Sequence, residues 1–464
     1  MSAATDTGRK VVRAPALTYL LLDRNCAVTP RSKSYLPPMD FLEELRYREL
    51  LQDVTPGLDE HLAANKPVTA YIGFDPTAPS LTIGNYVPIM LLKLFQLSGH
   101  QPIMLFGGAT GRIGDPSGKD QERTLKSNEE IEANLAAQKA QARELLKAEG
   151  GLKEVIFVDN FDFYRDFSVL DFLRQVGKTL TVNYMMSKDS VKTRLETGIS
   201  FTEFSYQLLQ GYDFECLYRQ HGCTVQMGGS DQWGNITAGT EFVRKNASGK
   251  AYGLTAPLLT KADGSKFGKS ESGNIWLDQS RTSPYDFYQF WLRADDRDLP
   301  RYIRTFSLRP RGELDALLVQ ASEPNPSQAK QALAEELTAR IHGQQALQDA
   351  QAVSEMLFNR KASPEQLRAL SASALAAIAK EISSAQLDRA ILQQDLTVID
   401  LLASHTDFVA SKSEARRAIK NNAVAVNKQK LSSEDATVGQ ADLLHDRYIM
   451  LENGKKNKLI VEFS

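Results

Sequence analysis

The stretch D-P-T-A-P-S-L-T-I-G-N, from Asp75 to Asn85, lies between an apolar run that predicts a β-strand, Val68 to Ile72, and one that predicts a long helix, Ile83 to Leu97. A strand that turns through proline and glycine into a helix start is a place to hold phosphate, because the free N–H groups of the first turn and the helix dipole both favour anions. Gly84 has no side chain, so a nucleotide could lie against its backbone. An ordinary strand-to-helix connection is the alternative that this stretch alone leaves open.

Predicted strands and helices alternate outward from this stretch. A capping box at Ser127 to Glu130 opens a helix that is expected to reach about Glu149, and another helix is expected after Asp231. Three more strands are predicted, over Pro102–Phe106, Glu154–Val158 and Cys223–Met227. Alternation of this kind predicts an α/β fold with a doubly wound, Rossmann-like parallel sheet, whose ligands lie at the carboxyl ends of the strands.

The chain has 464 residues, which is too many for one core, so several parts are expected. Residues 1–38 carry six Lys/Arg, two acids and no clear periodicity; they are predicted to be a disordered leader or a mis-assigned start, with a transit peptide as the alternative. After them the sequence predicts a Rossmann-like domain at 39–282, an α-helical domain at 283–360, a linker at 361–395 and a small α+β unit at 396–464.

The composition is that of a globular protein, with 42% hydrophobic residues and a formal net charge of only -2. No overall positive field is expected, so an RNA partner would have to be met by local basic patches. Three cysteines are too few and too badly spaced for a zinc site or a disulfide framework, which fits a reducing compartment, and the six histidines form no ligand cluster. No apolar run is long enough to span a membrane.

A glycine-rich segment, Gly264 to Ser270, carries two lysines, Lys266 and Lys269. It is not a P-loop, because three residues separate its glycines where four are needed. Two ammonium groups on a Gly-rich, mobile loop are suited to gripping a polyphosphate as it departs. A solvated basic loop is the alternative for this segment in isolation.

A second pattern places Tyr206, Gln210 and Asp213 at positions i, i+4 and i+7, on one face of a predicted helix. The neighbouring residues are largely apolar, Phe204 and Phe214 among them, so this polar row is expected to be buried. Buried polar groups need hydrogen-bond partners, and a small polar ligand would supply them.

These segments together resemble the class I aminoacyl-tRNA synthetases, and in particular the bacterial-type tyrosyl-tRNA synthetases, over roughly Met39 to Ser464. The Asp75–Asn85 stretch resembles the family's nucleotide signature, and Lys266-Phe267-Gly268-Lys269-Ser270 resembles its mobile lysine loop. The further segments that carry the resemblance are Gly107–Lys119, Val182–Met186, Tyr206–Asp213 and Gly228–Asn235. The signature usually reads H-I-G-H, whereas this chain has Thr82-Ile83-Gly84-Asn85, which puts the contribution of Thr82 to phosphate stabilisation in doubt.

The resemblance implies that the protein activates L-tyrosine with ATP to tyrosyl-adenylate and then transfers tyrosine to the 3′-terminal ribose of its tRNA. The tyrosine carboxylate is already ionised at neutral pH, so the first step needs no general base, and positioning and charge stabilisation carry the rate. The implied catalytic residues are Thr77, Thr82, Lys119, Arg123, Lys266 and Lys269. The implied ATP-binding residues are Gly73, Asp75, Gly84, Asn85, Asp231 and Lys269. Mg²⁺ is expected on the phosphates, and no tightly bound protein metal.

For the amino acid, the resemblance implies that Tyr71 and Asp213 flank the phenol hydroxyl as donor and acceptor. The ammonium group is assigned to Asp115, Tyr206 and Gln210, and the rest of the pocket to Thr110, Asn183 and Gln232. A pocket built to pair a hydroxyl rejects phenylalanine by stranding its own polar groups, a rule of which this family is itself an example. Two alternatives stay open: a tryptophanyl-tRNA synthetase, and an RNA-binding paralogue with reduced catalysis.

The implied partners are the tRNA for tyrosine and a second copy of the chain, joined through hydrophobic residues between Phe167 and Met186; no membrane partner is implied, and the implied location is cytoplasmic. The C-terminal unit resembles a small RNA-binding domain found in a ribosomal protein. A capping box at Ser411 opens a helix on which Lys412, Arg416 and Lys420 repeat every four residues, and this stripe is predicted to contact RNA phosphates, with a solvated face as the alternative.

Overall fold

The structure is a computed structural model. It describes residues 39–117, 125–188, 191–192, 194, 198–270, 273–359, 362–393, 395–454 and 457–464. The predicted leader at 1–38 and two of the predicted catalytic residues, Lys119 and Arg123, lie outside these ranges.

The first domain is built on a six-stranded sheet with the order β1-β6-β5-β2-β3-β4. Its strands are β1 (Asp53–Val54), β2 (Thr69–Phe74), β3 (Gln101–Phe106), β4 (Ile156–Asp159), β5 (Cys223–Gly229) and β6 (Tyr252–Ala256). β2 to β6 run parallel, and only β1 is antiparallel to its neighbour. From β2 the chain proceeds to β3 and β4 on one side and later to β5 and β6 on the other, so the order reverses between β2 and β5. The predicted doubly wound sheet is confirmed, and its ligand crevice belongs at this reversal.

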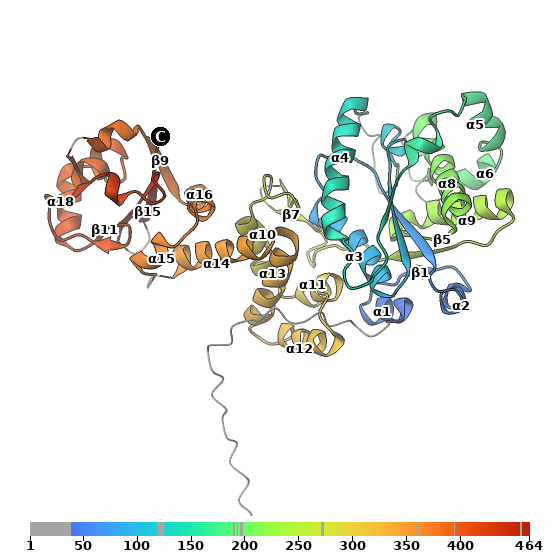
Figure 1. Ribbon diagram of the computed structural model, residues 1–464, viewed down its shortest axis with the longest axis horizontal. Helices are drawn as coiled ribbons and strands as arrows, with labels where there is room; N and C mark the ends of the chain where they lie inside the picture. Colours follow the sequence, from blue (N-terminus) through green and yellow to red (C-terminus); the bar gives the residue numbers. More distant parts are fainter. Residues whose placement is uncertain are drawn as a thin grey trace, which may run out of the picture. The chain divides into compact units, whose positions relative to one another are not determined.

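The helices of this domain cover both faces of the sheet. They are α1 (Phe41–Tyr47), α2 (Leu58–Ala64), α3 (Ile83–Leu97), α4 (Asn128–Leu145), α5 (Val169–Gln175), α6 (Val182–Met186), α8 (Phe201–His221) and α9 (Trp233–Ala247). α3 and α4 lie on one side of the sheet, and α8 and α9 lie on the other (Figure 1). The bounds of α3 are those predicted. α4 begins at the predicted cap, where the Ser127 hydroxyl accepts the Glu130 N–H, but ends four residues before Glu149.

The alternation of side chains along β2 distributes its residues between the two faces. Ala70, Ile72 and Phe74 belong to the apolar core that includes α3. Tyr71 points the other way and packs with Phe214 of α8, their ring centroids 5.2 Å apart. The sequence of this one strand therefore places a tyrosine on the face that carries the predicted polar row of α8.

Helices α10 to α14 form the next part of the chain. It contains α10 (Pro284–Leu292), α11 (Leu299–Phe306), α12 (Arg311–Ala321), α13 (Ser327–His342) and α14 (Gln344–Phe358). Its core is continuous with that of the sheet domain through residues such as Trp291 and Phe306. The buried Arg48 guanidinium also joins the two, because it pairs with Glu44 of α1 and donates to the backbone oxygens of Arg304 and Ser307.

The C-terminal unit has a five-stranded sheet of order β12-β11-β14-β15-β9. Its elements are α15 (Pro364–Arg368), α16 (Ala372–Glu381), β9 (Ser383–Leu387), β10 (Leu396–Thr397), α17 (Val398–Asp400), α18 (Lys412–Lys420), β11 (Val424–Val426), β12 (Gln429–Lys430), β13 (Thr437–Val438), β14 (Tyr448–Asn453) and β15 (Asn457–Phe463). The predicted linker at 361–395 is wrong. β9 pairs in parallel with β15, and Leu367 and Leu375 are buried in a core that also contains Met450.

Within the described part of the chain, no helix is both long and apolar enough to cross a bilayer.

Candidate active site

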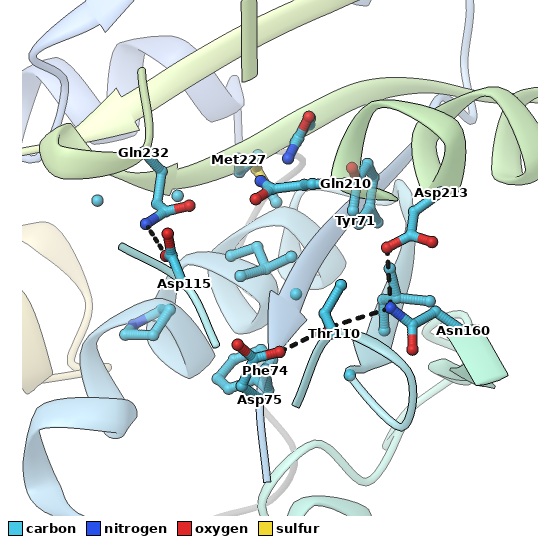
Figure 2. A pocket seen from close by; sticks show the side chains of 18 of the residues that line it. Tyr71, Phe74, Asp75, Thr110, Asp115, Asn160, Gln210, Asp213, Met227 and Gln232 are labelled. Carbon is cyan, nitrogen blue, oxygen red and sulfur yellow. Dashed lines mark hydrogen bonds between the residues drawn. The ribbon is translucent and has the colours of Figure 1, made fainter. Parts of the chain in front are cut away.

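A cavity of about 280 Å³ opens where the strand order reverses, at the carboxyl ends of β2 and β5. Its lining includes Tyr71, Gly73, Asp75, Thr77, Asn85, Thr110, Asp115, Asn160, Tyr206, Gln210, Asp213, Gln226 and Gln232. Figure 2 shows Tyr71, Asp213 and Asn160 gathered at one end and Asp115 and Gln232 at the other. The described lining residues include three carboxylates and no Lys, Arg or His, so the cavity suits a ligand that carries a positive charge.

The Asp213 carboxylate lies at the first end and is held by two donors. The Asn160 amide donates to Asp213 Oδ2 at 2.9 Å, and the Tyr164 hydroxyl donates to Asp213 Oδ1 at 2.7 Å. Burial raises the pKa of Asp213 to about 7; these two hydrogen bonds act in the opposite direction, and the charges of Asp75 and Asp159 add to the increase. The carboxylate is therefore fixed in direction and titrates near neutral pH.

The Tyr71 side chain contributes the second polar group at this end. It is 1% exposed, and its hydroxyl has no hydrogen-bond partner among the described residues. Burial raises the pKa of Tyr71 well above its usual value, so the phenol keeps its proton and can donate it. Gln210 Oε1 and Gln226 Oε1 are also buried without a partner in the described structure. Buried orphan groups of this kind are costly unless a ligand satisfies them.

The middle of the cavity is organised around Asp75, which follows β2. Its carboxylate accepts from the Thr110 hydroxyl at 2.7 Å and from the Tyr206 hydroxyl at 3.1 Å. Gly107 allows this approach, because a Cβ atom added there would lie 2.1 Å from Asp75 Oδ1. At the far end, Asp115 accepts from the Gln232 amide at 2.8 Å and from the Ser117 N–H at 2.9 Å.

The start of α3 forms the wall next to Asp75. Thr82 is the N-cap, and its hydroxyl accepts the Asn85 N–H at 3.4 Å while Asn85 Oδ1 accepts the Thr82 N–H at 3.0 Å. The two residues that replace the signature histidines thus form a capping box. Asn85 lines the cavity, whereas Thr82 and Gly84 are not among its lining residues.

The lysine loop passes over this helix start. Gly268 has φ +81°, and a Cβ atom there would lie 2.8 Å from the Ile83 side chain. The backbone also connects them, since the Ile83 N–H donates to Ile275 O and the Ile275 N–H donates to Gly268 O. Lys266 and Lys269 are both exposed. Neither lines the cavity, but the loop that carries them is packed against its nucleotide-signature wall.

Two predicted residues lie elsewhere. Asn183 is exposed on α6 and does not line the cavity, so the structure does not bring it to the predicted tyrosine pocket. Asn160, which the sequence analysis did not predict, lies in the cavity. This fully buried side chain donates to both Thr110 and Asp213. Its place directly after β4, at a carboxyl end of the sheet, is the signal that could have found it. Asp231, predicted to hold ATP, is exposed and outside the cavity lining.

The predicted RNA-binding stripe on α18 is exposed, but acidic residues partly neutralise it. Lys412 pairs with Asp400, and both Arg416 and Lys420 lie near Glu434, at 3.8 and 3.0 Å. Exposed ion pairs of this kind are weak, so the three cations stay available to a phosphate backbone that competes for them.

The chain matches two family models. Residues 63–359 match the model of class I tRNA synthetases for tryptophan and tyrosine (W and Y), and residues 375–461 match that of the tyrosine–tRNA ligase SYY-like C-terminal domain. A curated tyrosine–tRNA ligase from Porphyromonas gingivalis is 48% identical over 430 residues, which is 91% of this chain and 99% of the relative. The chain belongs to the tyrosine–tRNA ligase family.

Other members of the tyrosine–tRNA ligase family agree with this assignment. A curated relative from Cytophaga hutchinsonii is 47% identical over 428 residues, covering 92% of this chain and all of the relative. Among solved structures, a C-terminally truncated mitochondrial tyrosyl-tRNA synthetase from Aspergillus nidulans is similar, with a TM-score of 0.61 and 31% identity over 68% of this chain and 94% of its own. The matching family model is that of class I tRNA synthetases, and this ligase family is ATP-dependent. The prediction of an ATP-dependent class I synthetase is therefore confirmed.

Proposed function

We propose that this cavity binds L-tyrosine and ATP, and that the chain forms tyrosyl-adenylate there before transferring tyrosine to the 3′-terminal ribose of its tRNA. The observation that carries the choice of amino acid is the buried pair of Tyr71 and Asp213. The phenol hydroxyl of a bound tyrosine both donates and accepts. It can therefore donate to the Asp213 carboxylate and accept from the Tyr71 hydroxyl at the same time. An indole N–H only donates, so tryptophan would leave the Tyr71 hydroxyl unpaired.

The remaining polar groups have matching roles. The ammonium group of the substrate would lie against Asp115, Tyr206 and Gln210, with Thr110 and Gln232 beside it, and its carboxylate would attack the α-phosphate. Asp75, Gly73 and Asn85 line the side of the cavity that faces the nucleotide signature. Mg²⁺ would arrive on the phosphates of ATP and supply charge neutralisation there, together with the lysine loop.

Pyrophosphate exchange tests this function directly. Exchange of labelled pyrophosphate into ATP should depend on tyrosine and should not be supported by tryptophan or phenylalanine at the same concentration. Exchange with tryptophan would identify the related tryptophanyl enzyme, and RNA binding without any exchange would identify a paralogue with reduced catalysis.

A homodimer is proposed through α5 and α6. Val169 and Leu170 are 75% and 79% exposed, and Leu173, Val182 and Met186 add further exposed apolar surface on the same two helices. Apolar side chains gathered in this way mark an association surface, and a twofold axis lets one patch pair with itself.

The variant Leu170→Glu tests this surface. We expect it to halve the mass measured by light scattering after size exclusion, because a carboxylate would be buried without a partner in the dimer. Val319→Glu is the matched control, since Val319 is 66% exposed but lies on α12. A wild-type protein that is already monomeric, or a Leu170→Glu variant that stays dimeric, would contradict the proposed interface.

The C-terminal unit is proposed to bind tRNA, using the α18 stripe of Lys412, Arg416 and Lys420. Because β9 belongs to its sheet, a truncation that respects the structure removes everything after Asn359 rather than residues 396–464 alone. This variant should keep tyrosine-dependent pyrophosphate exchange within about twofold and lose at least about tenfold in kcat/KM for tRNA charging, since phosphate contacts dominate such binding. Equal loss of both activities in a protein that remains folded would contradict the modular assignment. The truncated Aspergillus relative shows that a member of the family without its C-terminal part can crystallise.

A further inference from the structure

The lysine loop begins as a small hairpin. Thr260 and Lys266 form an antiparallel bridge, the Lys261 N–H donates to Ser265 O at 2.9 Å, and the Gly264 N–H donates to Lys261 O at 2.9 Å. The two lysines proposed to act on the phosphates therefore lie on or just after a structured turn. The contacts that hold the hairpin therefore determine where the two lysines lie.

Helix α11 of the helical domain holds the hairpin through Asp298. This residue occupies the N-cap position of α11, where an aspartate ordinarily accepts an N–H of its own helix, but here it makes no such bond. Its Oδ2 instead accepts the Ala262 N–H of the hairpin at 3.0 Å, across 36 positions of sequence. The side chain is 2% exposed, and burying a carboxylate is costly unless it is paired. Asp298 therefore accepts a hydrogen bond from the loop in place of one from its own helix.

A second residue of α11 reinforces this contact. Arg301 donates to Thr260 O at 3.2 Å, and its other terminal nitrogen lies 3.6 Å from Asp298 Oδ1. The hairpin base and the hairpin tip are thus both bound by one helix, at residues three positions apart.

The Phe267 side chain, between the two lysines, gives a third point of attachment. Its ring lies 5.0 Å from that of Tyr302 and 5.6 Å from that of Phe306, both on α11. Phe306 also stacks on Tyr86 of α3, with centroids 5.8 Å apart and ring planes at 6°. One short helix therefore contacts both the lysine loop and the helix that carries the nucleotide signature.

Open space lies beside the hairpin on the same side. A cavity of about 810 Å³ is lined by Lys261, Asp263 and Lys269 of the loop and by Asp298 and Tyr302 of the helical domain. Space next to a loop permits more than one loop position, and the contacts with α11 stabilise the one described here.

From these contacts we infer that Asp298 is a positioning residue for the lysine loop, and that the helical domain sets the rate of adenylate formation through it without touching either substrate. The inference rests on the proposed action of Lys269 on the departing pyrophosphate. In this proposal Lys269 acts on the phosphates from the hairpin that Asp298 holds beside the start of α3. Loss of Asp298 then lowers the fraction of molecules in which the loop is correctly placed.

Single-turnover adenylate formation and tyrosine binding, measured on the full chain, test the inference. Asp298→Ala should slow adenylate formation about tenfold, the value of one charge-assisted hydrogen bond, while the Kd for tyrosine stays unchanged. Asp298→Asn should recover part of the rate, because its side-chain oxygen can still accept the Ala262 N–H. Asp296→Ala is the matched control: this exposed carboxylate pairs with Lys330 inside the helical domain and should leave both quantities unchanged. Trypsin should also cleave after Lys261 and Lys266 faster in Asp298→Ala than in the control.

A double substitution separates this inference from the function on which it rests. In a Lys269→Ala background, Asp298→Ala should have little further effect on the rate, because two changes that act through one contact are not additive. An equal slowing in both backgrounds, or a tyrosine Kd that weakens with the rate, would show that Asp298 only supports the fold. A slow Lys269→Ala with a normal Asp298→Ala would overturn the inference alone, whereas a normal Lys269→Ala would overturn the role of the lysine as well.

Discussion

Replacing Lys269 with alanine is expected to slow tyrosyl-adenylate formation by about ten- to a hundredfold, which corresponds to a charge-assisted contact of roughly 1.5–3 kcal/mol. The exposed Lys269 ammonium lies outside the cavity, on a loop packed over the start of α3. A contact that forms mainly as charge builds on the leaving pyrophosphate raises kcat without tightening the ground state. The dissociation constants of tyrosine and ATP should therefore change little, as measured by equilibrium binding beside single-turnover kinetics.

Lys153→Ala is the control for this experiment. Lys153 is also exposed, but it precedes β4 and so lies toward the amino ends of the parallel strands, away from the cavity at their carboxyl ends. A Lys269→Ala variant with a normal rate and weakened ATP binding would mean that the loop clamps the ground state, which would refute the role proposed for it.

Asp213→Asn is expected to raise the KM for tyrosine by about a hundredfold and to reduce the preference for tyrosine over phenylalanine by a similar factor. This is the effect expected when a buried site loses a hydrogen bond to a charged group. The amide keeps the shape of the carboxylate, but it cannot accept from Asn160, Tyr164 and a substrate phenol together. Asp162→Asn is the control, because this exposed carboxylate lies in the same turn as Asn160 and pairs only with Arg165 in the described structure.

The pH dependence of tyrosine binding provides a second measurement of the same group. Burial raises the pKa of Asp213 to about 7, so the ligand-free protein takes up a proton there as the pH falls through neutrality. Protonation favours folding of the free chain, since the folded state binds the proton more tightly than the unfolded state, but it weakens the acceptor that the phenol needs. The affinity for tyrosine should fall severalfold, on the order of tenfold at most per pH unit, between pH 8 and pH 6. In Asp213→Asn the affinity for tyrosine should be independent of pH over this range. Unchanged selectivity for tyrosine over phenylalanine in that variant would show that the phenol binds elsewhere.

Local patterns predicted much of this structure because local physics determines it. The bounds of α3, the Ser127 cap and the row of Tyr206, Gln210 and Asp213 all follow from helical periodicity and capping chemistry, which act over a few residues. The strands of the Rossmann-like sheet were found because a buried parallel strand is a short apolar run.

The errors concern contacts that join residues far apart in the sequence. Asn160 and Asn183 are the same residue type in short helical turns, and only the register of β4 beside β3 brings one of them to the cavity. The apolar alternation of β9 is limited to Ala385 and Leu387, with Ser383 and Ser384 exposed, and this segment becomes a strand because β15 offers an unpaired edge. The capping role of Thr82 and Asn85, by contrast, follows from their spacing of three residues at the start of α3.

The pairing of β9 with β15 has a consequence for biosynthesis. The Rossmann-like sheet can close once Ala256 has been made, because all six of its strands precede that point. β9 is made well before β15, and it must remain without its neighbour until Leu459 to Phe463 have left the ribosome. During translation the Rossmann-like domain is thus able to fold first, while the C-terminal unit presents an open strand edge that a chaperone or another nascent chain could occupy.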